Sequence, residues 1–205
     1  EACEKLIAGL RGKPITIVSG LALGIDSIAH RAALAAGLNT LAIPGSGLAP
    51  AAIHPRIHRA LAEKIVEAGG ALLSEFEPNF RATLWSFPQR NRIMAGLAHA
   101  VLVVEAEKKS GTLITAKLAT EYNRDVLTIT GSIFSPNAEG PHLLLRLGAT
   151  PIASSSELLE ALGFKTEAKN SQAQLALAYS DCSEDEKKIL ELLREPTARD
   201  LLINK

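Results

Sequence analysis

The chain has 205 residues, of which 47% are hydrophobic and 4% aromatic, and its 22 basic residues equal its 22 acidic residues in number. This length and apolar content suit one full domain with an appendage and exclude a wholly disordered chain. A formal net charge of +0 argues against a protein that coats nucleic acid through overall positive charge. No apolar run reaches the roughly 18 residues of a membrane-spanning helix, and Cys3 and Cys182 lack metal-ligand spacing. We therefore expect a protein of the reducing cytoplasm.

Short apolar runs rich in β-branched residues alternate along the chain with longer helical patterns. Residues 1–10 form an amphipathic helical pattern that this arrangement normally places after a strand, so we expect the chain to begin inside its domain. The strands predicted after it span residues 15–18, 40–43, 71–74, 100–104, 126–129 and 150–152. The helices predicted between and after them span residues 26–36, 56–68, 91–99, 112–122, 139–147 and 155–162. Asp26 is expected to cap the first of these helices, and Gly37 to end it.

Continuous apolar strands that alternate with helices indicate a parallel sheet covered by helices on both faces. The predicted fold class is therefore α/β, with an extended, Rossmann-like, doubly wound and mostly parallel sheet. Ligands of such folds bind at the carboxyl ends of the strands, which selects the loops 19–24, 44–47, 105–111 and 130–139.

The chain divides into a domain over residues 1–162, a polar linker over 163–182 and a small helical module over 183–205. The linker lacks the periodic apolar pattern of a core. Ser183 and Glu186 form a capping box at the start of a further helix. Too little chain follows for that module to fold alone, so we expect only part of it here.

The Ser-Gly-Thr triplet at 110–112 follows a predicted strand and opens a predicted helix. Free amides at a helix start, a glycine that permits close approach and two hydroxyl groups suit a bound phosphate. Ordinary capping of the helix by either hydroxyl is the alternative, and the triplet alone is more typical of it. Ser19 and Gly20 begin a second loop between a strand and a helix. That loop matches neither GxGxxG nor the P-loop pattern, so nucleotide hydrolysis has no specific support.

Two pairs of residues have the i, i+4 spacing that places side chains on one face of a helix. Asp26 and His30 would suit an acid/base pair, but their spacing is more typical of a cap and a hydrogen bond on the helix surface. His54 and His58 have the same spacing, but Pro55 lies between them and no third ligand is near. We therefore expect no metal site.

Four aromatic residues fall in the short, proline-containing segment before a predicted helix: Phe76, Phe80, Trp85 and Phe87. The segment runs directly into the Arg-Asn-Arg sequence at 90–92. Aromatic rings stack on bases and arginine forks hold phosphates, which favours a nucleic-acid surface. Alternatively, the rings anchor the loop on the core and the arginines pair with carboxylates such as those at positions 75 and 105.

Acidic residues are absent from two stretches, 27–62 and 78–104, although the chain is neutral overall. Arginines occur in both: Arg31, Arg56, Arg59, Arg81, Arg90 and Arg92. A solvated surface whose charges happen to cluster is the ordinary explanation. If the fold brings the two stretches together, they form a small positive surface.

Several longer motifs occur together and in order. Residues 19–30 read SGLALGIDSIAH, residues 87–97 read FPQRNRIMAGL, and residues 103–116 contain VVEA and SGTLITA. With shorter matches at positions 73–75 and 131–149, they resemble the bacterial DNA-processing protein A family (DprA, also called Smf). The resemblance covers residues 15–162.

The resemblance implies a cytoplasmic, dimeric recombination mediator that binds single-stranded DNA and is not an enzyme. Such a protein protects incoming strands during natural transformation and loads the RecA recombinase onto them. The resemblance also implies an extended Rossmann core followed by a winged-helix-like domain, of which residues 183–205 are a part. No cofactor or metal is expected.

The resemblance further implies which residues form the DNA site. By position in the motifs, the pocket would use Arg90, Asn91, Arg92, Ser110, Gly111, Thr112 and Thr115. Ser19 and Gly20 would line its edge, and Lys117 is a further basic candidate. The sequence departs from the family pattern in lacking the strand that ends in G-[ST]-R, whose arginine helps to grip phosphate. It also has Thr130 where proline is usual.

Two other functions remain open at this point. One is a Rossmann-like hydrolase of nucleoside monophosphates (a phosphoribohydrolase), for which Asp26, Glu105 or Glu107 would supply the carboxylate. No sequence feature fixes any of the three at the site. The other is a structural adaptor, which leaves the arginines at 90 and 92 unexplained.

Overall fold

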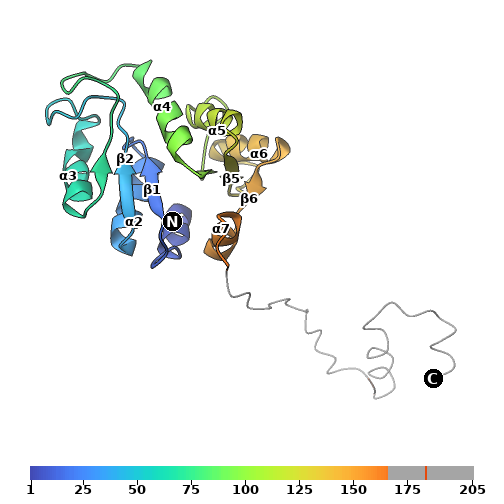
Figure 1. The fold of residues 1–205 in the computed structure, drawn as a ribbon. Helices are drawn as coiled ribbons and strands as arrows, with labels where there is room; N and C mark the ends of the chain where they lie inside the picture. Colours follow the sequence, from blue (N-terminus) through green and yellow to red (C-terminus); the bar gives the residue numbers. More distant parts are fainter. Residues whose placement is uncertain (166–182, 184–205) are drawn as a thin grey trace. The chain divides into compact units, whose positions relative to one another are not determined.

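The computed structural model of the chain describes residues 1–165 and residue 183 (Figure 1). Residues Glu1–Thr166 form one compact unit. Most of the predicted linker and the helix expected after Ser183 lie outside the described residues. Within the part that is described, no helix is both long and apolar enough to cross a membrane.

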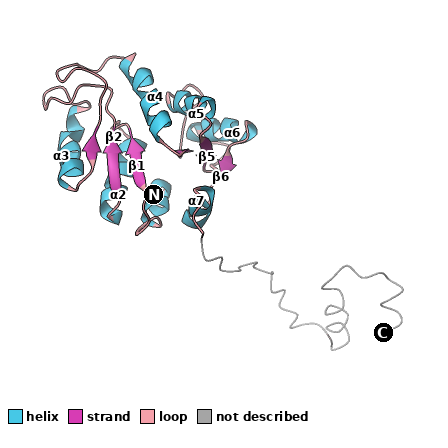
Figure 2. Cartoon of the chain, in the orientation of Figure 1, coloured by secondary structure: helices cyan, strands magenta, loops and turns pink. Residues whose placement is uncertain are grey.

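Strands and helices alternate through residues 1–165, as Figure 2 shows. The strands are β1 (Thr16–Ser19), β2 (Asn39–Ala42), β3 (Ala71–Leu72), β4 (Ala100–Val103), β5 (Asp125–Thr128) and β6 (Thr150–Pro151). The helices are α1 (Ala2–Ala8), α2 (Ile25–Ala36), α3 (Arg59–Glu67), α4 (Ser86–Leu97), α5 (Thr112–Glu121), α6 (Glu139–Arg146) and α7 (Ser155–Ala161), with 3-10 turns η1 (Arg56–His58) and η2 (Pro136–Ala138). Every element predicted before residue 163 is present, but α4 begins several residues earlier than expected.

The strands form two parallel sheets, in the orders β1-β2-β3 and β4-β5-β6. Residues 16–19 pair in register with residues 39–42, and residues 100–103 pair with residues 125–128. The predicted α/β class of parallel strands and intervening helices is confirmed. The hydrogen-bonded strands are, however, divided between two sheets instead of forming one.

One apolar cluster joins the two sheets. Leu6 of α1, Ala33 of α2 and Leu158 of α7 are buried in it, together with Leu127 of β5. Ile17 of β1 packs against the same cluster. Because side chains from both sheets share this core, the carboxyl ends of their strands are held in a fixed arrangement.

The aromatic segment before α4 packs largely on itself. The rings of Phe76 and Phe80 stack with centroids 4.5 Å apart, and Trp85 meets them edge-on at 5.9 and 5.6 Å. The Gly47 N–H donates to the Phe80 carbonyl at 2.9 Å, which joins this segment to the loop after β2. Loop anchoring, the alternative raised for these rings, therefore accounts for Phe76 and Phe80.

The loop at residues 44–47 was expected to hold a ligand, and this prediction is wrong. All four of its residues are buried. A Cβ atom at Gly47 would lie 2.1 Å from the carbonyl oxygen of Glu77, so the aromatic segment covers this loop directly. The remaining loops at the carboxyl ends are those after β1, β4 and β5.

Candidate functional site

Arg90 of α4 is only 4% exposed and points beneath the loops that follow β1 and β2. Its Nη1 donates to the carbonyl oxygen of Gly20 at 2.7 Å and also to that of Ile43. A Cβ atom at Gly20 would lie 2.4 Å from the same nitrogen, so only glycine permits this close packing. The guanidinium therefore ties two loops together.

The positively charged guanidinium of Arg90 is buried away from water. Burial lowers the pKa of the guanidinium, and the negative charge of Asp26 partly opposes that shift. No ion pair to Arg90 is present among residues 1–165. A buried positive charge without an ion-pair partner favours an anion nearby, because attraction is strong where water is excluded.

Asp26 accepts two hydrogen bonds from the end of β1 and the loop that follows it. The Ser19 hydroxyl donates to one carboxylate oxygen of Asp26 at 2.8 Å, and the Ala22 N–H donates to the other at 3.1 Å. Asp26 is therefore not the predicted cap of α2: that position belongs to Gly24, whose φ of 80° favours glycine. The prediction that Gly37 ends the helix is confirmed, since it has a left-handed φ of 69°.

Asn91 links this region to the start of α5. Its Oδ1 accepts from Arg90 Nε at 3.2 Å, and its Nδ2 donates to the Gly111 carbonyl at 3.4 Å. Five of the expected site positions, from Ser19 to Gly111, thus lie in one connected region. It spans the carboxyl ends of β1 and β4.

The triplet at the start of α5 remains partly open. Ser110 Oγ accepts from the Thr112 N–H at 3.2 Å and donates to the Thr112 hydroxyl at 3.0 Å. Ser110 thus bonds the first N–H of α5, as the capping alternative expected, although the cap position itself belongs to Gly111, which supplies no side-chain cap. A Cβ atom at Gly111 would nevertheless meet nothing within 4 Å, and the Gly111 N–H donates no hydrogen bond within residues 1–165. Space and a free donor coincide at this residue.

Three other predicted site residues are either buried or already in an ion pair. Thr115 is buried one turn into α5, at 6% exposure. Lys117 is exposed and its Nζ lies 3.7 Å from Glu121 Oε1, toward the far end of the helix. Arg92 is half exposed and pairs with Glu75, as the alternative for this arginine anticipated. The structure therefore does not bring Lys117 to the open triplet.

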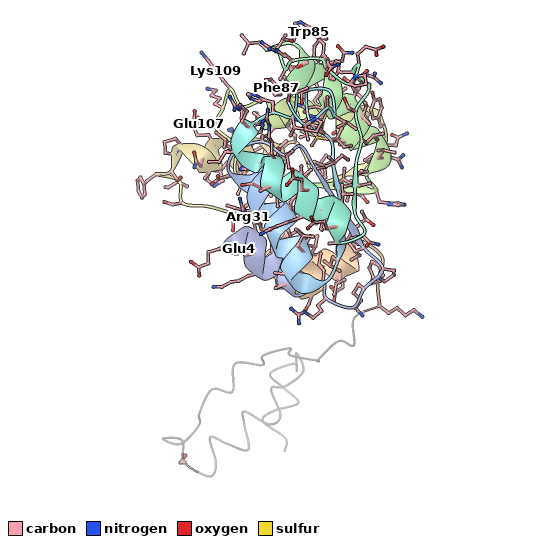
Figure 3. All side chains as sticks on the ribbon, turned by 90° about the vertical axis from the view of Figure 1, so that its left-hand side faces the viewer. Glu4, Arg31, Trp85, Phe87, Glu107 and Lys109 are labelled. Carbon is pink, nitrogen blue, oxygen red and sulfur yellow. The ribbon has the colours of Figure 1, made fainter. Side chains whose placement is uncertain are left out.

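The β4–α5 loop carries both signs of charge. Its exposed charged side chains are Glu105, Glu107, Lys108 and Lys109. Glu107 and Lys109 lie toward the same end of the unit as Trp85 and Phe87, away from Glu4 (Figure 3). Neither lysine forms an ion pair within the described residues.

Two of the carboxylates considered for a hydrolase are bonded to different parts of the protein. Asp26 is held by two donors in the β1–α2 loop. Glu105 accepts from Asn137 Nδ2 at 3.3 Å, at the η2 end of a different loop. Across residues 1–165 and 183, no group of His, Cys, Asp and Glu side chains is arranged to hold a metal ion.

Neither explanation offered for His30, an acid/base pair with Asp26 or a hydrogen bond on the helix surface, fits the structure. His30 is fully buried, and its Nδ1 lies 2.7 Å from the hydroxyl of Thr40, which donates onward to the Ile17 carbonyl. Burial lowers the pKa of His30 from 6.5 to about 4. The neutral ring is therefore part of the packing beneath β1 and β2, not an acid/base group at the surface.

Sequence reasoning missed Ser86, the first residue of α4. Its side chain is fully buried, and its hydroxyl donates to the Gly45 carbonyl at 2.6 Å and accepts from the Thr83 N–H at 3.0 Å. Ser86 is inside the helix and Trp85 holds the cap position, so the usual capping preference gives no signal for this helix start. These contacts place the α4 side chains that follow it.

Comparisons with known proteins place the chain among characterised relatives. The model of the family described as DNA recombination-mediator protein A matches residues 1–163. Protein Smf of Escherichia coli strain K12 is 47% identical over 162 residues, which are 79% of this chain and 42% of that protein. The chain thus spans less than half the length of this relative.

Two solved structures are similar to this fold. The X-ray structure of DNA processing protein A from Streptococcus pneumoniae has a TM-score of 0.71 and 40% identity, covering 80% of this chain and 56% of that one. DNA processing protein A from Helicobacter pylori, described for its single-stranded-DNA binding mode, has a TM-score of 0.67 and 29% identity. The second match covers 78% of this chain and 71% of the other.

Proposed function

The chain belongs to the DNA recombination-mediator protein A family, and from that membership we propose that it binds single-stranded DNA through a few backbone phosphates. The contact lies at the carboxyl ends of β1 and β4, where Arg90, Asn91 and the start of α5 meet. The proposed activity is binding and not catalysis. Its assignment to single-stranded DNA is supported by the Helicobacter pylori relative, whose structure is described for that binding mode.

The observation that carries this proposal is the open start of α5 beside a buried positive charge. Gly111 has a free N–H and no atom where its Cβ would be, so an anionic oxygen has room to approach the amide. The hydroxyls of Ser110 and Thr112 offer further donors once they turn from each other. The guanidinium of Arg90 lies beneath the site and adds positive potential to it. Asn91 connects the two, because it accepts from Arg90 and donates to the Gly111 carbonyl.

The two arginines take different roles in this proposal. Arg90 shapes the site, because a direct contact with DNA would require its guanidinium to leave the carbonyls of Gly20 and Ile43. Arg92 is half exposed and reaches a phosphate by exchanging Glu75 for it. Lys108 and Lys109 are exposed in the β4–α5 loop and add two further positive charges that could contact phosphates.

The first test compares strands and salt concentrations. Fluorescence anisotropy of the full 205-residue chain is measured with labelled oligothymidine and with a duplex of equal length, at about 50 and 200 mM salt. We expect tighter binding of the single strand and a marked loss at the higher salt concentration. Tighter binding of the duplex, or affinity independent of salt, would contradict the proposal.

A charge-matched pair of variants locates the contact. Substituting Lys108→Gln together with Lys109→Gln removes two phosphate contacts and lowers the slope of log K against log salt by about 1.4. Lys13→Gln together with Lys64→Gln makes the same change of net charge in the turn before β1 and on α3, and leaves the slope unchanged. Equal slopes for the two double variants would place the DNA elsewhere.

Loading of RecA, assembly into a homodimer and a role in natural transformation extend the proposal on family grounds. All three belong to the cytoplasm, where the buried free thiol of Cys3 stays reduced. The expected result is faster assembly of RecA filaments on oligothymidine when the chain is present. Sedimentation equilibrium of the chain alone tests the dimer.

A further inference from the structure

An open groove runs along one face of α3, between the segment before η1 and the edge strand β3. It has a volume of about 310 Å³. Its apolar lining consists of Pro50, Ile53, Ala62, Val66 and Leu72. In Figure 1, α3 lies on the side of the unit opposite to α5 and α6. No residue that lines the groove belongs to the proposed phosphate site.

The apolar part of the groove is only partly covered by the protein itself. Ile53 and Ala62 are buried, whereas Val66 is 52% exposed although it lies beside them in the same groove. Apolar surface exposed next to a buried apolar floor gains free energy when a further apolar side chain covers it. The groove therefore favours an aliphatic side chain from outside the domain.

Two exposed carboxylates stand along the same groove. Glu63 and Glu67 are one helical turn apart on α3, so they share a face of it. Arg59 precedes Glu63 by four residues, the spacing of a helix ion pair, but its Nη2 donates to the Ala51 carbonyl at 2.7 Å instead. Within residues 1–165 neither glutamate forms an ion pair. The groove therefore presents negative charge, which complements a basic partner.

The backbone beside the groove belongs to a strand at the edge of its sheet. β3 is the last strand in the order β1-β2-β3, and the Leu73 N–H donates to the Ala42 carbonyl of β2 at 2.9 Å. Because backbone groups point alternately to the two sides of a strand, those of Leu72 point away from β2. An extended segment can pair with such an edge and place every second side chain in an adjoining groove.

We propose that this groove binds a short extended segment of a partner protein, in which an aliphatic residue lies between two basic ones at alternate positions. The segment pairs with the backbone of Leu72, and its aliphatic side chain covers Val66. Its two basic side chains face Glu63 and Glu67. The inference goes beyond DNA binding and does not rest on it, because no residue of the phosphate site takes part.

The test uses a defined peptide with this pattern, acetylated Lys-Thr-Ile-Thr-Lys-amide. Its binding to the isotope-labelled full chain is followed through the amide resonances in NMR spectra. We expect saturable shifts at Ala62, Val66 and Leu72, and none at Gly111.

Three altered peptides separate the parts of the contact. Glutamates in place of both lysines reverse the charge, serine in place of isoleucine removes the apolar side chain, and N-methyl groups on the three central amides prevent pairing with β3. Each altered peptide should bind about tenfold more weakly than the first, or not measurably.

A first pair of variants tests the apolar contact. Val66→Ser should weaken binding of the peptide about fivefold to tenfold. Leu97→Ser is the matched control, because Leu97 is 50% exposed at the end of α4, outside the groove. It should bind the peptide as the parent chain does. Thermal unfolding verifies that both variants are folded.

A second pair tests the charges. Glu63→Gln together with Glu67→Gln should weaken binding by about fivefold and leave little dependence on salt. Glu107→Gln together with Glu121→Gln makes the same change of net charge elsewhere and should leave the affinity unchanged.

Several outcomes would overturn the inference. They are the absence of saturable shifts at the groove, equal affinity for the acidic peptide, and unaltered affinity in both groove variants. Shifts at Val66 and Leu72 on addition of oligothymidine would also overturn it, because they would place the groove on the path of the DNA. Peptide binding at the groove by a chain that fails to bind oligothymidine would support the inference while contradicting the proposed function.

Discussion

The loops after β1 and β4 occupy equivalent positions in two parallel sheets, yet Gly20 in the first and Gly111 in the second have very different surroundings. After β1, Ser19 and Asp26 bond to each other and Gly20 packs against Arg90, so the loop is closed. After β4, Gly111 has a free amide and open space around it. The comparison shows that a glycine at the carboxyl end of a strand can serve close internal packing in one loop and leave open space in another.

The largest effect is expected from removing the side chain that closes the β1 loop. Arg90→Met leaves the carbonyls of Gly20 and Ile43 without their donor and should lower the free energy of unfolding by about 3 to 4 kcal/mol. Arg92→Met, which removes a half-exposed ion pair with Glu75, should cost less than about 1 kcal/mol. Urea denaturation of both variants measures the difference. Similar losses in the free energy of unfolding would mean that the two arginines contribute equally to stability.

A second, slightly smaller effect follows from acidification, because His30 lies buried beneath the same closed region. Burial lowers its pKa from 6.5 to about 4, so the unfolded chain binds a proton in that range that the folded chain does not. The free energy of unfolding should therefore fall as the pH drops from 6.5 to 4, by up to about 3 kcal/mol.

The control for this pH dependence is His30→Asn, whose amide nitrogen can still reach Thr40 but does not titrate. Carboxylates that titrate in the same range contribute equally to both proteins, so the difference between the two pH profiles isolates the imidazole. Parallel profiles between pH 6.5 and 4 would show that protonated His30 is tolerated in the fold.

The smallest expected effect is on stability, and it differs between the two glycines. Gly20→Ala places a methyl group against the bound guanidinium of Arg90 and should cost about 2 kcal/mol of stability. Gly111→Ala has room, and its backbone φ of −59° suits alanine, so its stability should change by less than about 0.5 kcal/mol.

Gly111→Ala should nevertheless bind single-stranded DNA more weakly, because the added methyl group blocks the approach of a phosphate to the free amide. Thermal unfolding and anisotropy on the same samples give both quantities. A Gly111→Ala variant with unchanged affinity would remove the start of α5 from the proposed contact.

Most of the fold could be predicted because it depends on local patterns. The strand at 100–103 is a continuous apolar run, and the glycine at position 37 ends α2 where the helical pattern stops. The start of α4 was missed because Pro88 and the aromatic residues before it read as a loop. Proline is tolerated in the first turn of a helix, where its missing N–H has no partner to lose.

The candidate site was less predictable, because its main partners are backbone atoms. The carbonyls that hold Arg90 belong to Gly20 and Ile43, and a carbonyl has no signature in the sequence. The motif therefore located the arginine but not its burial. By contrast, Arg92 pairs with Glu75, one of the carboxylates that the sequence offered, because that contact joins two side chains.

The division of the strands into two sheets has a consequence for how the domain tolerates mutation. Within a sheet, every residue supplies the same backbone donors and acceptors, so many substitutions leave the hydrogen bonds intact. Between the sheets, the polar link depends on individual side chains: Arg90 binds the loops after β1 and β2, and Asn91 bonds both Arg90 and the Gly111 carbonyl. A substitution at Asn91 would therefore break this polar link, while the apolar cluster shared by α1, α2 and α7 would still hold the sheets together.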